Sequence, residues 1–332
     1  MSGMSLKSIV IALLCIVVLI TLPYTSHTAL RFSNAALPLH KSNNYAYAAF
    51  LAAPSEITHD APDEDDMYFV NTRMLIYQAL YAPATRTVNS YPFVVLVTPD
   101  VTQSKRQRLE ADGAQVIEAP KLALKHSTRK QWRDVLTKLR LFELTQFDKV
   151  LFLDSDMLLV KPMDGIFSDP AVEERANKND TSLETMPADE APQPQSYLFA
   201  AISGSGSWKH VLPPKGSRSI NAGCVVFRPS LDLFNYYVSL AQPELEGRFN
   251  GRYPEQGLWA YAHRPEGNMP WGRLDPNWNI NWATHRDLEY GIASLHSKFW
   301  QLDHDPLLRD YGLSVKWTME GYWEGRERRE IS

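Results

Sequence analysis

Apolar and polar residues along the body of the chain alternate in a way that predicts strands separated by helices. Strand patterns, most of them continuously apolar as in buried parallel sheets, lie at Ala46–Ala53, Phe93–Val97, Gln115–Glu118, Val150–Leu153 and Gly223–Arg228. Helical spacing of apolar residues, or a polar run ended by glycine, predicts helices at Asp66–Tyr81, Lys105–Ala111, Lys130–Leu144 and Leu231–Leu240. Strands that alternate with helices favour right-handed crossovers, so we expect an α/β domain with a mostly parallel sheet flanked by helices.

Two later segments break this pattern. Residues 170–196 are rich in Glu, Asp, Asn, Pro and Ala and show no apolar spacing, so we interpret them as a mobile insertion. Beyond Gly257 the chain is dense in Trp, Asn, Gly and Pro, which favours a loop-built binding face over regular packing. We therefore expect one folded domain at residues 45–305, followed by a C-terminal extension at 306–332.

The N-terminus carries an unbroken apolar run, Ile9–Leu22, between Lys7 and Pro23. A buried helix of a soluble domain would show polar residues at helical spacing, and this run shows none. The small residues that a cleaved signal peptide needs fit poorly at Tyr24–Ala29, although cleavage stays an alternative. We favour a signal anchor, which divides this part of the chain into a cytosolic tail (1–8), a transmembrane helix (9–24) and a luminal stem (25–44). The short run suits the thin membranes of the early secretory pathway, which predicts a single-pass type II protein of the ER or Golgi with its body in the lumen.

Composition and charge narrow the possible functions. The chain has 332 residues, of which 44% are hydrophobic, and its formal net charge of -4 argues against a general nucleic-acid binder. Cys15 and Cys224 are the only cysteines and lie far apart in the sequence, so no disulfide framework is indicated. Asn179-Asp180-Thr181 is an N-glycosylation sequon in a polar segment, which agrees with a luminal location.

Asp154 and Asp156 come directly after the apolar strand Val150–Leu153. In α/β sheets, ligands bind beyond the carboxyl ends of the strands, and two carboxylates there can hold a hard divalent cation that neutralises diphosphate oxygens. Asp63–Asp65 and Asp303–Asp305 match the same Asp-x-Asp pattern, but neither pair follows a buried strand. The alternative interpretation is a strand-end turn with a solvated pair of charges.

The segment Thr137–Asp156, which contains these two aspartates, resembles the centre of glycosyltransferase family 8, which includes glycogenin. Four further segments within Ala46–Trp300 resemble motifs of that family in the same order: Asn221–Ser230, Glu255–Leu258, Leu274–Asn279 and Leu295–Trp300. The resemblance implies a GT-A fold with a Rossmann-like sheet, a UDP-sugar donor, Mn²⁺ or Mg²⁺ as cofactor, and transfer with retention of anomeric configuration.

The resemblance also implies roles for individual residues. Asp154, Asp156 and His296 would bind the metal ion, and this mixed oxygen and nitrogen set suits Mn²⁺. Asn221 and Gln256 would be the catalytic pair that hydrogen-bonds the donor sugar near the reacting carbon. On its own, a histidine such as His296 is more often a hydrogen-bonded structural residue than a ligand.

Four more residues are expected at the donor. The resemblance implies that Lys138 and Lys298 lie near the diphosphate, where a positive charge stabilises phosphate oxygens. Leu51 and Tyr68 align with the region that contacts uridine. Without the resemblance, Lys138 would be interpreted as an exposed helical residue.

Three departures from the family pattern are visible. Glu255 stands where the family usually has Asp, and Ala222 stands where Ser is common. Lys298 and Trp300 follow His296 at a shorter spacing than usual. In addition, no tyrosine aligns with the self-glucosylated tyrosine of glycogenin, which together with the N-terminal apolar run argues against a cytosolic glycogen primer.

These observations predict a retaining, metal-dependent glycosyltransferase of the secretory pathway. It would move a hexose or N-acetylhexosamine from a UDP-sugar to a hydroxyl of a glycan, lipid or protein acceptor. The departures leave open a catalytically degenerate transferase fold that acts as a binding or scaffold protein. A metal-dependent phosphohydrolase usually needs more carboxylates around paired metals, and the sequence gives no sign of such a cluster.

Overall fold

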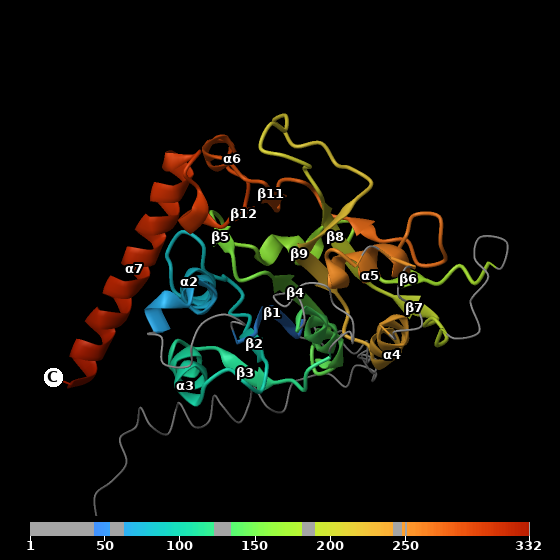
Figure 1. Ribbon diagram of the computed structural model, residues 1–332, viewed down its shortest axis with the longest axis horizontal. Helices are drawn as coiled ribbons and strands as arrows, with labels where there is room; N and C mark the ends of the chain where they lie inside the picture. The colour runs from blue at the N-terminus through green and yellow to red at the C-terminus, as the bar shows by residue number, and fades with distance from the viewer. Residues whose placement is uncertain are drawn as a thin grey trace, which may run out of the picture. The chain divides into compact units, whose positions relative to one another are not determined.

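The structure is a computed structural model of the chain, and it describes residues 43–53, 63–122, 134–180, 190–241, 248–249 and 251–331. Strands lie in the centre of the described part and helices lie around them (Figure 1). The predicted cytosolic tail (1–8), the transmembrane helix (9–24) and the stem (25–44) up to Ser42 lie outside the described residues. Among the residues that are described, no helix is both long and apolar enough to cross a membrane.

A seven-stranded sheet forms the centre of the fold, in the order β10-β8-β9-β4-β1-β2-β3. Its strands are β1 (Tyr45–Leu51), β2 (Phe93–Val97), β3 (Gln115–Glu118), β4 (Lys149–Leu153), β8 (Phe199–Ser203), β9 (Ile220–Phe227) and β10 (Gly272–Arg273). Parallel pairs join β1 to β2 and β4, β2 to β3, and β10 to β8, whereas β9 runs antiparallel to β4 and β8. The expected α/β fold with a mostly parallel sheet is therefore confirmed.

Helices surround this sheet. The α-helices are α2 (Met67–Leu80), α3 (Gln103–Ala111), α4 (Leu231–Leu240), α5 (Pro254–Ala262), α6 (His285–Tyr290) and α7 (Pro306–Ile331). The 3₁₀-helices are η1 (Asp63–Asp65), η3 (Val135–Glu143), η4 (Asp164–Ser168) and η6 (Phe299–Gln301). The predicted helices are confirmed at α2, α3 and α4, with ends shifted by at most two residues.

Both faces of the central sheet are buried, which explains why its strands read as continuous apolar runs. Along β1, Ala46 and Ala48 pack into one core, and Tyr47 and Ala49 pack into the other. The first core includes residues of η3, α4 and α5, and the second includes residues of α2 and α3. Figure 1 shows α2 and α3 on one side of the central strands and α4 and α5 on the other.

The predicted α-helix at Lys130–Leu144 differs from the structure. Residues 130–133 lie outside the described part, and Val135–Glu143 winds as the 3₁₀-helix η3. In a 3₁₀-helix, residues three apart share a face, so Val135, Lys138 and Leu141 align. All three are buried, because η3 packs between the sheet and the helices α4 and α5. The apolar spacing identified the buried segment but could not distinguish the two types of helix.

Two smaller sheets complete the fold. β11 (Ile280–Asn281), β12 (Ser294–His296) and β5 (Met157–Leu159) form one, and β5 directly follows the turn after β4. β6 (Arg175–Ala176) and β7 (Ser196–Tyr197) form the other, within and beside the predicted insertion at 170–196. Residues 181–189 of that insertion lie outside the described part, so its mobility stays a prediction.

The region beyond Gly257 is more regular than the sequence predicts. Its short strands and loops lead into α7, a helix of 26 residues that packs against α2 and η6. Gly312 allows this packing, because a Cβ atom there would lie 2.6 Å from Cδ2 of Phe299.

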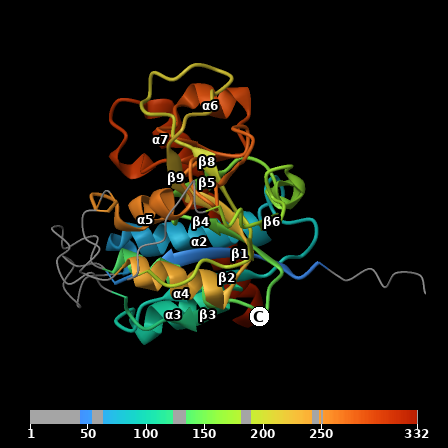
Figure 2. The ribbon, with the colours of Figure 1, turned by 90° about the vertical axis from the view of Figure 1, so that its right-hand side faces the viewer.

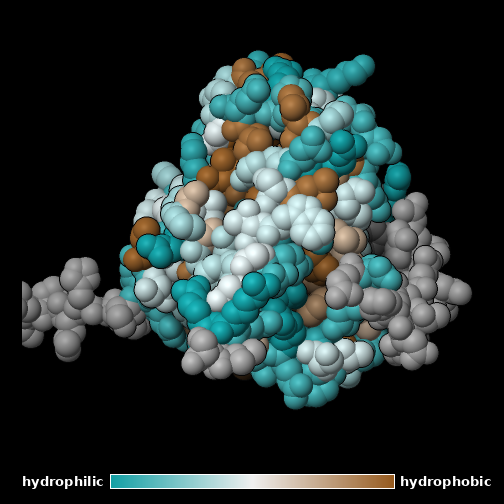
Figure 3. Space-filling model, turned by 90° about the vertical axis from the view of Figure 1, so that its left-hand side faces the viewer, coloured by the Kyte–Doolittle hydropathy of each residue, from teal (hydrophilic) through white to brown (hydrophobic). Residues whose placement is uncertain are grey.

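Figure 3 shows the face that lies on the left in Figure 1, where apolar residues occur mainly in the upper half among polar ones.

Candidate metal centre and donor site

The turn after β4 is fixed by backbone hydrogen bonds from two directions. The Asp154 N–H donates to the Gly223 carbonyl of β9 at 2.8 Å. The Ser297 N–H donates to the Asp156 carbonyl at 3.0 Å, which ties the end of β12 to the same turn. The turn is therefore held between the antiparallel neighbour of β4 and the small sheet that carries His296.

Ser155, between the two aspartates, points the other way and anchors the turn to the core. Its hydroxyl donates to the Phe50 carbonyl at 3.1 Å and accepts from the Thr72 hydroxyl at 3.0 Å. Ser155 and Thr72 are both buried. Because this middle residue is fixed, the side chains of Asp154 and Asp156 are left to point toward the edge of the sheet.

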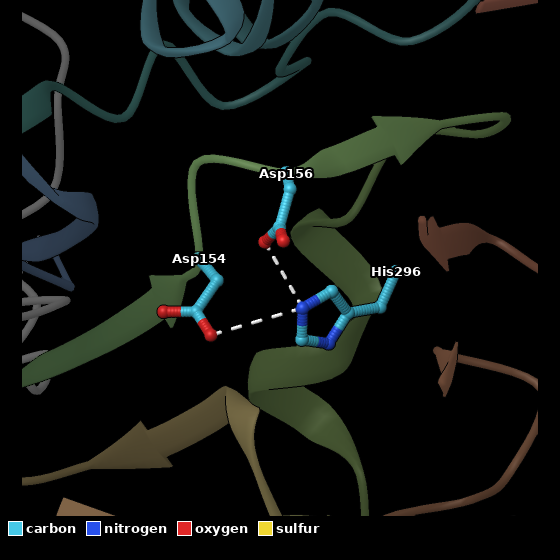
Figure 4. Close-up of side chains that lie close together, drawn as sticks. All are labelled: Asp154, Asp156 and His296. Atoms are coloured by element: carbon cyan, nitrogen blue, oxygen red, sulfur yellow. Dashed lines mark ion pairs between the residues drawn. The ribbon is translucent and has the colours of Figure 1, made fainter. Parts of the chain in front are cut away.

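The side chains of Asp154, Asp156 and His296 converge at this edge (Figure 4). His296 Nε2 lies 3.0 Å from Asp156 Oδ1 and 3.8 Å from Asp154 Oδ2. One possible ligand atom from each residue lies within 4.8 Å of the other two. Among the described residues, no other group of three His, Cys, Asp or Glu side chains has this spacing. The structure therefore brings together the three residues that the sequence predicts as metal ligands.

Gly223 makes room for the imidazole. A Cβ atom at this position would lie 2.5 Å from both Nδ1 and Cε1 of His296, closer than any non-bonded contact allows. Asn221 Oδ1 lies 3.4 Å from His296 Nδ1 and accepts the Gly223 N–H at 3.1 Å. An amide oxygen at Nδ1 favours the tautomer that carries its proton there, which leaves Nε2 free to bind a cation.

Each aspartate also pairs with a lysine. Lys138 Nζ lies 2.7 Å from Asp154 Oδ1 and 3.1 Å from Glu255 Oε1. Lys298 Nζ lies 3.0 Å from Asp156 Oδ2. Both aspartates thus turn one oxygen toward His296 and the other toward an ammonium group, which fixes the orientation of each carboxylate.

These contacts shift the pKa values of the cluster. Burial alone raises the pKa of Asp156, but His296 and Lys298 outweigh it and hold this pKa well below its usual range. Burial lowers the pKa of His296, but the carboxylates of Asp156 and Asp154 outweigh burial and raise it. The pKa values of Lys138 and Lys298 are also raised, since the neighbouring carboxylates outweigh burial. The site therefore keeps Asp156 ionised and favours positive charge beside it.

The donor set fits a divalent metal ion. Ligands at about 2.1 Å from an ion lie about 3 Å apart at right angles and at most about 4.2 Å apart. The distances of 3.0 and 3.8 Å from His296 Nε2 to the two aspartates fall in this range. With His296 neutral, as metal binding requires, three carboxylates of the cluster face two ammonium groups, and this excess of negative charge favours a cation.

The two residues predicted to contact the donor sugar lie on adjacent elements. Asn221 is on β9, and Gln256 is in the first turn of α5. Gln256 Oε1 accepts the Ala222 N–H at 3.1 Å, and its Nε2 makes no hydrogen bond to any other described residue. A small cavity of about 190 Å³ opens beside Gln256, with Tyr253 and Trp271 in its wall.

The residues expected near uridine and phosphate are placed differently from one another. Tyr68 is 46% exposed, and its hydroxyl accepts a hydrogen bond of 2.6 Å from Lys298. The ammonium of Lys298 also lies 4.8 Å from the centroid of the Tyr68 ring. Leu51, at the end of β1, is only 2% exposed and packs in the core. Tyr68 and Lys298 are therefore accessible to a ligand, whereas the Leu51 side chain is not.

The other two Asp-x-Asp matches have other roles. Asp63 lies 3.8 Å from Lys105 Nζ. Asp305 accepts the backbone N–H groups of His285 and Leu308, so it joins α6 to the start of α7. Neither pair belongs to a group with metal-ligand spacing among the described residues.

Two residues of the site were not predicted from the sequence. Glu255 stands out in the sequence as a departure from the family pattern, but the sequence does not predict its contact with Lys138. A buried lysine needs a nearby carboxylate, which is a signal available once η3 is known to be buried. Gly223 lies within a family motif, but the reason for a glycine there is the close approach of His296, which is 73 positions away in the sequence.

Comparison with known proteins gives uncharacterized relatives over most of the chain, among them the Schizosaccharomyces pombe protein C5H10.12c, which is 29% identical over 89% of this chain and 88% of the relative. No protein-family model matches. The chain is 31% identical over 287 residues to the uncharacterized protein C4C3.09 of Schizosaccharomyces pombe, covering 78% of this chain and 73% of the relative. It is 28% identical over 149 residues to galactinol synthase 1 of Solanum lycopersicum, covering 43% of each protein. Among solved structures, the glycosyltransferase GlyE of Streptococcus pneumoniae shares 14% identity at a TM-score of 0.46, covering 85% of this chain and 64% of that chain.

Proposed function

We propose that this chain, which belongs to the same family as the Schizosaccharomyces pombe protein C4C3.09, is a glycosyltransferase that takes a sugar from a nucleotide-diphosphate donor. The observation that carries the proposal is the cluster of Asp154, Asp156 and His296 at the carboxyl end of β4, with a lysine against each aspartate. The order of the family 8 motifs along the sequence and the partial similarity to galactinol synthase 1 support it.

Asp154, Asp156 and His296 would hold a divalent cation, with Mn²⁺ as the ion that best suits two carboxylates and one imidazole. When bound, the cation would supply electrostatic stabilisation of the leaving diphosphate. Lys298 would bind a diphosphate oxygen, because its ammonium is partly exposed beside Asp156. Lys138 is almost fully buried, so we assign it to orienting Asp154 and adding positive charge behind it.

The donor sugar would lie between the cation site and Gln256. The free Nε2 of Gln256 can donate a hydrogen bond to a sugar oxygen while Oε1 stays bound to the Ala222 N–H. The side-chain N–H₂ of Asn221 is available in the same way, since its oxygen faces His296 and Gly223. We propose a UDP-hexose or UDP-N-acetylhexosamine as donor and retention of configuration, on the strength of the family resemblance.

We further propose that the protein is anchored by residues 9–24, with its body in the lumen of the ER or Golgi. The apolar run next to Lys7 supports this topology. Asn179 is exposed, which leaves it accessible for glycosylation. Protease treatment of sealed microsomes should leave the body intact until detergent is added, and digestion without detergent would refute the proposed topology.

A donor panel tests the proposed activity. Purified protein is incubated with UDP-glucose, UDP-galactose, UDP-N-acetylglucosamine and, as an unrelated donor, GDP-mannose, with Mn²⁺ or with EDTA. We expect release of UDP from one of the UDP-sugars that depends on Mn²⁺. If every donor stays intact in the presence of Mn²⁺ and of a glycan acceptor mixture, the transferase proposal fails and a binding protein with this fold remains.

A further inference from the structure

Trp208 and Trp282 lie on the surface with their rings in contact. Each residue is 42% exposed, their ring centroids are 4.5 Å apart, and the ring planes meet at 85°. His304 packs against Trp208 at a centroid distance of 4.4 Å. Indole rings that are exposed yet held in place by neighbours are typical of binding surfaces. We call Trp208, Trp282 and His304 the aromatic platform.

The backbone of Trp282 is held in an unusual conformation. Its φ angle is 60°, in the left-handed region that bulky side chains rarely occupy. Such backbone strain persists only where the surrounding structure imposes it, and it recurs at binding and catalytic sites. Ordinary packing gives no reason for it here, because almost half of the residue stays exposed.

The aromatic platform is adjacent to the candidate metal centre. Asn281, the residue before Trp282, is the register partner of His296 in the pairing of β11 with β12. The same Asn281 accepts the Ser205 N–H at 2.8 Å, which fixes the loop that carries Trp208. Figure 1 shows this loop, in yellow, near the orange segment that contains β11, and Figure 2 shows it beside α6. Trp282 thus directly follows the strand that pairs with the strand of His296.

The loop between β8 and β9 also links the aromatic platform to the cavity beside Gln256. Residues 204–219 contain serines, two lysines and an arginine, and no acidic residue. The loop carries Trp208 near one end, and Arg218 and Ser219 at its other end line the cavity. A ligand that begins in the cavity and extends along this loop would therefore reach the exposed indoles.

We propose that the aromatic platform is a subsite for a sugar ring of the acceptor, one or more residues away from the hydroxyl that is glycosylated. This inference rests on the proposed transferase function and makes the acceptor an oligosaccharide. Indole faces stack on the apolar face of a pyranose ring, and serine and lysine side chains suit the sugar hydroxyls around it. The residues that flank Trp208 directly, Ser207 and Lys209, are polar, whereas a protein or lipid partner would favour an apolar surround.

Binding and kinetics test the subsite with three variants: Trp208→Ala, Trp282→Ala and, as a matched control, Trp317→Ala. Trp317 is 63% exposed on α7 and contacts Lys316. The probes are the tetraoses of the cello, malto, manno and chito series and their monosaccharides, titrated by calorimetry without donor and then used as acceptors. We expect at least one tetraose to bind wild-type protein about tenfold more tightly than its monosaccharide, as one stacking contact implies.

Trp208→Ala and Trp282→Ala should each raise the KM for that tetraose about tenfold, and Trp317→Ala should leave it unchanged. Tetraoses that bind wild-type protein no better than monosaccharides overturn the inference, and so does an equal loss in all three variants. Binding of phosphatidylcholine vesicles that Trp208→Ala abolishes, without oligosaccharide binding, also overturns it. Release of UDP from the donor by wild-type protein without acceptor reports the transferase function separately, so failure of the subsite and failure of the function are distinguishable.

Discussion

Replacing Gly223 with alanine tests whether His296 is a metal ligand without touching any ligand. The added Cβ would lie 2.5 Å from Nδ1 and Cε1 of His296 and 3.0 Å from Cε of Met157. Gly223 lies in β9, and its φ angle is not positive, so alanine fits the backbone of this strand. The change therefore presses on the imidazole while the strand can stay as it is.

The magnitude follows from this geometry. Non-bonded carbon contacts sit at about 3.5 Å, so the imidazole must retreat by roughly 1 Å. Metal-ligand distances tolerate only about 0.2 Å, so a shift of that size removes His296 from the ligand set. Displacing or misorienting a ligand of this kind typically costs about 10- to 100-fold in metal affinity, or about 1.4 to 2.7 kcal/mol.

Calorimetric titration with Mn²⁺ measures the effect directly, and circular dichroism checks the fold. Gly321→Ala is the matched control, because nothing lies within 4 Å of the Cβ position of Gly321 in α7. We expect Gly223→Ala to weaken Mn²⁺ binding by 10- to 100-fold and Gly321→Ala to leave it unchanged. In a His296→Ala background, Gly223→Ala should have no further effect. Wild-type affinity in Gly223→Ala, or an equal loss in both backgrounds, refutes the assignment of His296.

Two further predictions concern stability, both read from urea unfolding. Lys138→Met should lower the free energy of unfolding by about 3 kcal/mol, because it leaves Asp154 and the buried Glu255 without their cation. The double variant Lys138→Met with Glu255→Met should recover part of this loss. If Lys138→Met is as stable as wild type, the buried pair does not contribute as we infer. Burial, opposed by the hydrogen bond to the Met269 carbonyl, lowers the pKa of His263 from 6.5 to about 3, so the unfolded state takes up a proton first as the pH falls. The contribution of His263 to the free energy of unfolding is therefore present above pH 6.5 and should fall by roughly 1.4 kcal/mol per pH unit below it. His263→Gln should show a shallower dependence of the free energy of unfolding on pH. Equal slopes in the two proteins would contradict the assignment.

The sequence predicts the sheet well because burial on both faces leaves a direct trace. Phe93–Val97 coincides with β2, since a strand covered on both sides is continuously apolar. Gln115–Glu118 coincides with β3, a partly exposed strand at the edge of the sheet. The antiparallel direction of β9 is different. It depends on the path of the loop from β8, and no local pattern at Gly223–Arg228 encodes it.

The site divides in the same way. Asp154 and Asp156 are local features of one strand end, and the strand pattern alone selects them over Asp63–Asp65 and Asp303–Asp305. His296 could be chosen only through the family resemblance, because its approach to Asp156 spans 140 positions and depends on β12 pairing with β5. The Trp-rich region beyond Gly257 predicts a binding face that includes Trp282, but the contact of Trp282 with the distant Trp208 is a property of the folded chain.

The most direct test of the account is Mn²⁺-dependent release of UDP by Asp156→Asn compared with Asp303→Asn. Asn keeps the shape of the side chain but removes the charge that faces His296 and Lys298. We predict that Asp156→Asn folds normally and loses roughly a thousandfold in kcat/KM. Asp303 is exposed before α7, so Asp303→Asn should match wild type across the Mn²⁺ titration. Normal turnover by Asp156→Asn, above all if Asp303→Asn is inactive, would contradict the assignment of the metal centre to the carboxyl end of β4.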